Sequence, residues 1–124
     1  MNICACCILW NELPQGSDHN AVTGLFFKSE NGETYLFAVT LQIAVVFALD
    51  RPDTHMTVLD EHGAEPNCVT MTHDSELVLG REEAVYFYGI DGRGPCFAFD
   101  GKKLLMECFR GNLICVMLNK TNQR

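Results

Sequence analysis

The chain has 124 residues and a mass of 13.9 kDa, which predicts at most one domain with a single hydrophobic core. Hydrophobic residues make up 48% and charged residues 20%, so the composition is not that of a disordered chain. No run approaches the roughly 20 apolar residues of a membrane-spanning helix. Nine basic against sixteen acidic residues give a net charge of −7, which argues against nucleic acid and against anionic lipid as electrostatic partners.

The first half of the chain alternates short, apolar, β-branched runs with turn signals, a pattern typical of β-strands. Asn31-Gly32 is a strong signal for a hairpin turn. The run over 43–49 is too short and too rich in β-branched residues to favour a helix. Strands are predicted over 21–27, 35–40, 43–49 and 56–59.

The second half continues in the same way, with a glycine-rich turn over 89–94. Arg93-Gly94-Pro95 is interpreted as a β-turn that enters an outer strand, with Gly94 supplying a positive φ. Arg110-Gly111-Asn112 is interpreted as a hairpin turn. Strands are predicted over 68–72, 76–79, 84–88, 96–99, 103–109 and 113–118.

An internal repeat relates the two halves. Leu36 corresponds to Leu77 and Ile43 to Ala84, each 41 residues further on, and 58–60 correspond to 98–100. A third unit begins at Lys103 and fills two strand positions. Four strands in about 40 residues is the period of a propeller blade.

The repeat predicts an all-β fold, a partial β-propeller of about two four-stranded blades plus part of a third. A blade has two apolar faces and buries them by stacking on its neighbours. Because a closed propeller needs about four to eight blades, we expect this chain to be part of a longer protein. The alternative is an autonomous small β-sandwich or barrel that binds a peptide or an apolar ligand.

The predicted organisation has three parts. Residues 1–19 form a divergent N-terminal segment outside the propeller, 20–118 form the partial propeller, and 119–124 form a frayed polar tail. The N-terminal segment lacks a basic region and a small-residue cleavage site, so a secretory signal is not predicted.

The seven cysteines are an odd number, so a complete disulfide set within one chain is impossible and reduced thiols in the cytosol are expected. The N-terminal trio has the spacing C-x-C-C, which is not that of a zinc site, so no metal site is predicted. The trio is Cys4, Cys6 and Cys7. The others lie in apolar runs, where a thiol behaves as a small hydrophobe; they are Cys68, Cys96, Cys108 and Cys115.

Cys68 with His62 or His73 is a candidate thiol–imidazole pair for a hydrolase, but a core cysteine and solvated loop histidines are favoured. Asp60, Glu61 and Asp100 are candidate paired carboxylates and are interpreted instead as solvated turn acids.

Aromatic residues cluster in two neighbouring strands of the second unit and are interpreted as cross-strand core pairs. They are Tyr86, Phe87, Tyr88, Phe97 and Phe99. The glycine-rich turn is not a phosphate loop, since no Gly-Lys-Ser/Thr and no helix follow it. No catalytic, cofactor-binding or metal-binding residue is therefore predicted.

One stretch carries a specific family resemblance. It contains Val85-Tyr86-Phe87-Tyr88, the run from Arg93 to Gly101, Lys103-Leu104, Phe109-Arg110-Gly111 and an apolar strand over 113–116. This pattern resembles the amino-terminal propeller of the vacuolar protein sorting-associated protein eleven family. Weaker matches upstream, such as Val22-Thr23-Gly24-Leu25, extend the resemblance over about 20–118.

The resemblance implies a non-enzymatic scaffold in a core subunit of the HOPS and CORVET tethering complexes, acting in vesicle docking and fusion and in vacuolar or lysosomal protein transport. It implies the other complex subunits, Rab GTPases and SNAREs as partners, and a cytoplasmic location, peripheral on late endosome and lysosome membranes. The family's helical solenoid and RING zinc finger are not in this sequence, so no cofactor is expected. Asp91, Gly92 and Arg93 form the candidate interaction loop.

Overall fold

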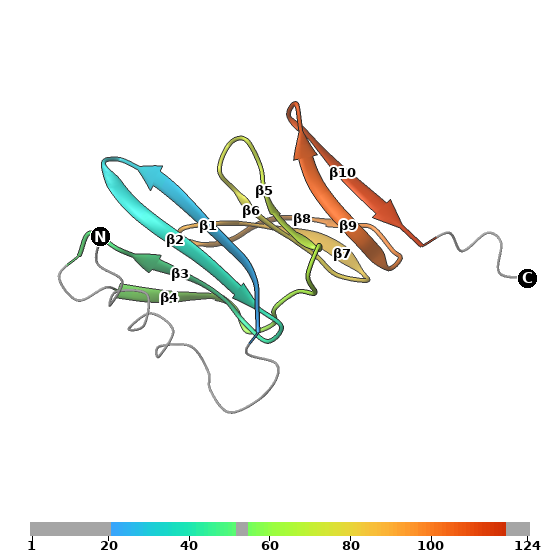
Figure 1. Cartoon of the computed structure of the whole chain (residues 1–124), viewed down its shortest axis with the longest axis horizontal. Helices are drawn as coiled ribbons and strands as arrows, with labels where there is room; N and C mark the ends of the chain where they lie inside the picture. The colour runs from blue at the N-terminus through green and yellow to red at the C-terminus, as the bar shows by residue number, and fades with distance from the viewer. Residues whose placement is uncertain (1–20, 52–54, 119–124) are drawn as a thin grey trace, which may run out of the picture.

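The structure, a computed structural model, describes residues 21–51 and 55–118. Within these ranges the chain forms ten strands in three antiparallel sheets and no helix (Figure 1). The strands are β1 (Val22–Glu30), β2 (Glu33–Thr40), β3 (Ala44–Ala48), β4 (His55–Asp60), β5 (Val69–Met71), β6 (Leu77–Gly80), β7 (Ala84–Gly89), β8 (Gly92–Ala98), β9 (Lys103–Phe109) and β10 (Asn112–Met117).

The first sheet, blade 1, has the strand order β1-β2-β3-β4, so each strand pairs with the next in the chain. The β1–β2 hairpin turns at Asn31 (φ 52°) and Gly32 (φ 80°). Two successive positive φ angles are those of a type I′ turn, whose twist matches that of the strands it joins. The hairpin predicted from Asn-Gly is confirmed.

The second sheet, blade 2, repeats this order as β5-β6-β7-β8. The prediction of a β-turn at Arg93-Gly94-Pro95 is wrong, because all three residues lie within β8. The turn lies before the predicted position, at Ile90 and Asp91. The glycine with the positive φ is Gly92 (136°) and not Gly94.

Proline is accommodated in β8 because β8 is the outermost strand of blade 2. A register shift also falls there, since Tyr86 pairs with Cys96 whereas Tyr88 pairs with Arg93. β8 thus carries one residue more than β7 over this stretch, which is a β-bulge.

The third sheet, blade 3, contains only β9 and β10 in the described part of the chain. Their hairpin turns at Arg110 (φ 52°) and Gly111 (φ 80°), again type I′, which confirms the predicted hairpin.

The sheets stack side by side as blades of a partial β-propeller. The first strands of successive blades are in contact, β1 with β5 and β5 with β9, and the outer strand β4 contacts β8. Figure 1 shows the three sheets following one another along the long axis. The alternative of one closed sandwich or barrel is wrong, because strand order is sequential within each sheet and no strand among residues 21–51 and 55–118 joins two sheets.

The largest core lies between blades 1 and 2 and explains why their strands are apolar almost throughout. Blade 1 contributes Phe37 and Val46, and blade 2 contributes Leu77, Leu79 and Tyr88, all of them buried. A smaller core between blades 2 and 3 contains Val78, Val85 and Met106.

Strand pairing corrects one part of the predicted repeat. The offset of 41 residues holds for the turn between the second and third strands of each blade. In blade 1 the Thr40 N–H donates to the Ile43 carbonyl, and in blade 2 the Arg81 N–H donates to the Ala84 carbonyl in the same way. The fourth strands differ: Ala44 pairs with Asp60, but its equivalent Val85 pairs with Phe97. Asp60 therefore corresponds to Phe97 and not to Asp100. The connection from β7 to β8 (90–91) is shorter than the connection from β3 to β4 (49–54), which changes the offset between the fourth strands.

Within 21–51 and 55–118, no helix is long and apolar enough to cross a membrane. The predictions for 1–19 and 119–124 lie outside the described residues, as do Cys4, Cys6 and Cys7.

Candidate functional site

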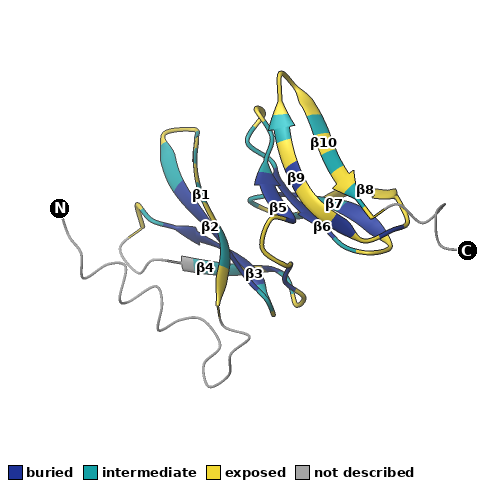
Figure 2. Cartoon of the chain, turned by 45° about the vertical axis from the view of Figure 1, so that its right-hand side comes forward, coloured by how far each residue is buried: buried dark blue, intermediate teal, exposed yellow. Residues whose placement is uncertain are grey.

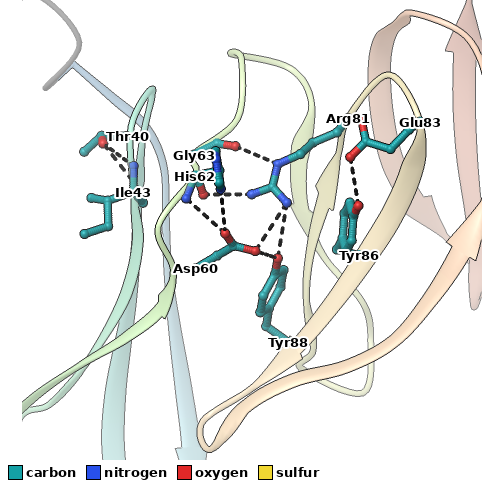
Figure 3. A network of polar contacts seen from close by, with 9 residues as sticks. All are labelled: Thr40, Ile43, Asp60, His62, Gly63, Arg81, Glu83, Tyr86 and Tyr88. Carbon is teal, nitrogen blue, oxygen red and sulfur yellow. Dashed lines mark hydrogen bonds and ion pairs between the residues drawn. The ribbon is translucent and has the colours of Figure 1, made fainter.

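The most elaborate polar cluster of the described chain lies between blades 1 and 2 (Figure 3). We call it the interblade clasp and define it by Asp60, Arg81 and Tyr88. Asp60 ends β4, Arg81 follows β6 and Tyr88 lies in β7, so the clasp joins the two blades. The side chains of Arg81 and Asp60 are only 16% and 14% exposed, and Tyr88 is fully buried.

All three nitrogens of the Arg81 guanidinium group donate hydrogen bonds, to blade 1, to the linker and to Tyr88 of blade 2. Its Nη1 donates to Asp60 Oδ2 (3.3 Å) and to the Tyr88 hydroxyl (3.4 Å). Its Nη2 donates to the His62 carbonyl (2.7 Å) and its Nε to the Gly63 carbonyl (3.2 Å). The carbonyls belong to the linker between the blades, so one side chain holds the linker and the end of β4.

Asp60 accepts hydrogen bonds at both carboxylate oxygens. The Tyr88 hydroxyl donates to Oδ2, and the His62 backbone N–H donates to Oδ1 (3.0 Å). The His62 imidazole lies 3.4 Å from Oδ1 but is 82% exposed. The prediction of Asp60 as a solvated turn acid is wrong, because the neighbouring blade covers it.

The clasp separates the pKa values of its acid and its phenol. Burial alone would raise the pKa of Asp60. The hydrogen bonds from Tyr88 and His62 and the charge of Arg81 outweigh burial, so the pKa of Asp60 lies below its ordinary value of 3.8. Burial and the hydrogen bond to Asp60 raise the pKa of Tyr88 to about 12. At neutral pH Asp60 is charged and Tyr88 is neutral, which makes the clasp a fixed ion pair with a phenol donor and poorly suited to proton transfer.

The predicted thiol–imidazole pair is not assembled. Cys68 is buried and its thiol donates to the Lys103 carbonyl (3.1 Å). Burial raises the pKa of the Cys68 thiol, which disfavours the nucleophilic thiolate. Among the described contacts His62 faces Asp60 and His73 faces Asp74, so neither imidazole is bonded to the sulfur.

Cys68 is the core cysteine that the sequence predicts, but the three other described cysteines are not fully buried. Cys96 lies in the apolar run that the sequence indicates, but it is exposed on the outer strand β8. Cys108 and Cys115 are partly buried in blade 3.

The remaining carboxylates stay apart. Glu61 and Asp100 are exposed, as predicted. In the described ranges, no three His, Cys, Asp or Glu side chains gather in a way that could hold a metal ion.

The aromatic cluster divides between core and surface. Tyr88 is buried between blades 1 and 2, and Phe87 contacts Phe97 edge-to-face with ring centroids 5.6 Å apart. Phe97 and Phe99 are 59% and 44% exposed, so their prediction as core residues is wrong for this chain. Both lie on the outer part of blade 2, where no third or fourth strand of blade 3 is described to cover them.

Asp91 of the candidate interaction loop is exposed and lies at the edge of the interblade contact. It lines a cavity of about 190 Å³ together with Ile90 and residues of blade 1, among them Tyr35 and Arg51. The exposed Arg93 has its guanidinium carbon 5.4 Å from the ring centroid of Tyr86, a cation–π distance. Gly92 supplies the positive φ that begins β8.

Two further cavities flank the clasp. One, of about 310 Å³, is lined by residues that include Glu65, Glu82 and Lys102. The other, of about 620 Å³, is lined by residues that include Gln42 and Glu61. Their walls carry both signs of charge, so neither selects a strongly charged ligand.

The sequence analysis did not single out Arg81, which is the centre of the clasp. The sequence offered one signal, a cation placed between two apolar strands just after Gly80. Its partners in blade 1 and the linker lie about 20 positions upstream, and only the stacking of the blades reveals them.

Comparison with known proteins assigns the chain. A model of the family described as PEP5/VPS11 N-terminal matches residues 10–124. The chain is 46% identical over 103 residues to the vacuolar protein-sorting-associated protein 11 homolog of Arabidopsis thaliana. The aligned region covers 83% of this chain and 11% of that protein. It is 39% identical over 98 residues to the Homo sapiens homolog, and this aligned region covers 77% of this chain and 10% of that protein.

The chain thus spans about a tenth of the length of the curated relatives it matches. The family match includes residues 10–19, which lie outside the range of about 20–118 that carried the sequence resemblance. No significant match was found among solved structures. With its partial propeller and this match over most of its length, the chain belongs to the PEP5/VPS11 N-terminal family.

Proposed function

We propose that the chain is a non-enzymatic interaction unit within a vacuolar protein-sorting subunit. Support comes from the family match and from relatives that are named for vacuolar protein sorting. The unit contributes rigid β-blades whose exposed loops contact other proteins, and no bond is made or broken.

The interblade clasp is the observation that carries this proposal. Its charged groups are engaged with one another and with the linker carbonyls, and its pKa values favour a permanent ion pair at neutral pH. Such an arrangement fixes the orientation of two blades, and an orientation is what a scaffold supplies to its partners.

The finer role that we propose follows the family resemblance. The unit belongs to a subunit of the HOPS and CORVET tethering complexes and acts in vesicle docking and fusion. Its partners are other subunits, Rab GTPases and SNAREs, and it works on the cytoplasmic side of late endosome and lysosome membranes. It uses no cofactor.

We place one contact at the loop of Asp91, Gly92 and Arg93. Asp91 in the turn and Arg93 near the start of β8 are exposed and carry opposite charges. Such a pair suits recognition of a polar partner surface, where complementary charges set specificity and the rate of association.

The test is replacement of the gene by a charge-reversed variant, Asp91→Arg with Arg93→Glu. Co-purification of the complex subunits and delivery of a soluble vacuolar hydrolase are expected to fall about tenfold, as for removal of a charged contact worth about 1.4 kcal/mol. The matched control, Arg110→Ala, alters an exposed cation in a turn of blade 3 and is expected to behave as the unmodified protein.

Normal co-purification and delivery in the charge-reversed variant would remove the loop from the proposal. Normal delivery after disruption of the whole gene would remove the sorting function itself.

A further inference from the structure

The turn between β1 and β2 contains the dipeptide Asn31-Gly32, which is exposed at the end of the hairpin (Figure 2). Asparagine is a chemically labile residue, because the backbone nitrogen of the next residue can attack the carbon of its carboxamide. Glycine favours this attack, since it has no Cβ to hinder the approach. A Cβ added at Gly32 would meet nothing within 4 Å, so the surrounding chain leaves the approach open as well.

The backbone nitrogen of Gly32 is also free to react. Glu30 and Glu33 form the last residue pair of the β1–β2 ladder, so Asn31 and Gly32 are the two central residues of a two-residue turn. Among the described residues, the Gly32 N–H donates to no acceptor. The nitrogen can therefore lose its proton to a base in the solvent without first breaking a contact.

The two further asparagines in 21–51 and 55–118, Asn67 and Asn112, lack this combination. Asn67 is followed by Cys68, which carries a side chain and whose N–H donates to the Glu65 carbonyl (3.1 Å). Asn112 is followed by Leu113, whose side chain hinders the approach to the nitrogen. Neither position offers a glycine nitrogen.

Another step of this kind, Asp100-Gly101, shows the opposite arrangement. Gly101 is buried, and its N–H donates to the Glu82 carbonyl (2.9 Å). The carboxylate of Asp100 is also a poorer electrophile than a carboxamide. This step therefore provides a comparison in which the glycine nitrogen is occupied.

We propose that Asn31-Gly32 is a site of spontaneous deamidation and isoaspartate formation. The Gly32 nitrogen loses its proton and bonds to Asn31 Cγ, the Cγ–Nδ2 bond breaks, and the amide group takes up a proton and leaves as ammonia. Water then opens the cyclic imide. Opening at the main-chain carbonyl of residue 31 gives isoaspartate, and opening at Cγ gives aspartate. The site is independent of the proposed sorting role.

The products change the hairpin in two ways. Isoaspartate routes the main chain through Cγ and so lengthens a turn whose type I′ geometry fixes the register of β1 against β2. Both products also add a negative charge between Glu30 and Glu33, where like charges repel. The end of the β1–β2 ladder is therefore expected to loosen as the chain ages.

The experiment incubates the full chain, fused to a solubilising protein, in a mildly alkaline buffer that supplies the base. Mass spectrometry of proteolytic peptides is expected to show replacement of the carboxamide at Asn31 by a carboxylate, with isoaspartate and aspartate both present. Asn67 and Asn112 are expected to stay intact over the same time. The control variant Asn31→Gly retains the type I′ turn, which accepts Gly-Gly, and is expected to show no change in this peptide.

The variant Asp100→Asn gives the chain a second Asn-Gly step and tests whether the structure decides the rate. The Gly101 N–H must first leave the Glu82 carbonyl. Deamidation at position 100 is therefore expected to be at least about tenfold slower than at Asn31, as for a hydrogen bond worth about 1.4 kcal/mol. In concentrated denaturant this contact is absent, and the two positions are expected to react at similar rates.

Amide hydrogen exchange measures the effect of the modification on the hairpin. After ageing, exchange is expected to become about tenfold faster at the end of β1 next to the turn, a loss of about 1.4 kcal/mol of local stability. The β9–β10 hairpin has a type I′ turn without a carboxamide, at Arg110 and Gly111, and its exchange is expected to stay unchanged.

An intact Asn31 after incubation would overturn the site, as would faster deamidation at Asn67 or Asn112. Equal rates at positions 31 and 100 in the folded Asp100→Asn chain would also overturn it, because the structure would then not select the reacting step. Unchanged exchange at the end of β1 after ageing would contradict the effect assigned to the modification.

Discussion

At the scale of single residues, the Arg81 side chain connects both blades and the linker between them. It joins the carboxylate of one blade, the phenol of another and two linker carbonyls with one planar group. A guanidinium suits this task because its donors point in fixed directions and it stays charged when partly buried. Burial lowers the pKa of Arg81, but Tyr88 and Asp60 outweigh burial and raise it.

Removal of the guanidinium by Arg81→Met is expected to lower the free energy that holds blades 1 and 2 together by about 3 kcal/mol, since it leaves Asp60 buried without its cation. The control is Arg51→Met, because the Arg51–Glu33 pair (3.5 Å) is largely exposed and worth less than about 1 kcal/mol. Native-state hydrogen exchange of the β7 amides measures both effects. Equal effects of the two substitutions would show that the clasp contributes no more than a surface ion pair.

The pKa shifts within the clasp predict its pH dependence. The pKa of Asp60 is lowered by folding, so its contribution is present above 3.8 and is lost as the pH falls through the lower folded value. The pKa of Tyr88 is raised from 10.0 to about 12, so its contribution is complete below pH 10 and is lost as the pH rises through about 12. Stability from the clasp is therefore constant across the neutral range.

An ultraviolet titration of tyrosinate checks the alkaline side. One component is expected to ionise near pH 12, and Tyr88→Phe is expected to remove it. Ionisation of Tyr88 near pH 10 would contradict the burial and hydrogen bonding assigned to its hydroxyl.

At the scale of elements, the linker between blades 1 and 2 depends on a close backbone approach at Gly63. A Cβ at this position would lie 1.8 Å from the Thr40 carbonyl oxygen and 2.6 Å from the Leu41 carbonyl carbon. Both are backbone atoms, so the linker cannot accept a side chain without moving away from the loop between β2 and β3.

Gly63→Ala is therefore expected to cost about 1–3 kcal/mol, the range for overpacking, and to weaken the clasp through the displaced Gly63 carbonyl. Gly89→Ala in β7 is the control, because an added Cβ there meets nothing within 4 Å. Hydrogen exchange of the linker amides, including Ala64 N–H, which donates to Thr40 (3.1 Å), measures the difference. Unchanged protection in Gly63→Ala would contradict the close approach.

At the scale of the whole molecule, local sequence signals predicted most of the fold. Apolar β-branched runs placed all ten strands, and Asn31-Gly32 and Arg110-Gly111 marked turns that require positive φ angles. The errors occurred where a contact between blades decides the outcome: Asp60 is covered by blade 2, and Arg81 acts through residues distant in sequence. β8 begins four residues earlier than predicted because a bulge lets an edge strand include Pro95.

The incomplete stack has consequences for the isolated chain. Apolar side chains remain exposed at both ends of the stack, with Leu25 and Phe27 on blade 1 at 54% and 64%, and Ile114 and Val116 on blade 3. Figure 2 shows exposed residues along β9 and β10. Open apolar faces and strand edges of this kind promote self-association.

The solution state of the isolated chain tests the central claim, that these blades belong to a larger stack, most directly. Size-exclusion chromatography with light scattering, followed by a thermal scan, is expected to show poorly soluble, polydisperse material without a cooperative transition. A monodisperse monomer that melts cooperatively would show a self-contained domain and contradict the account.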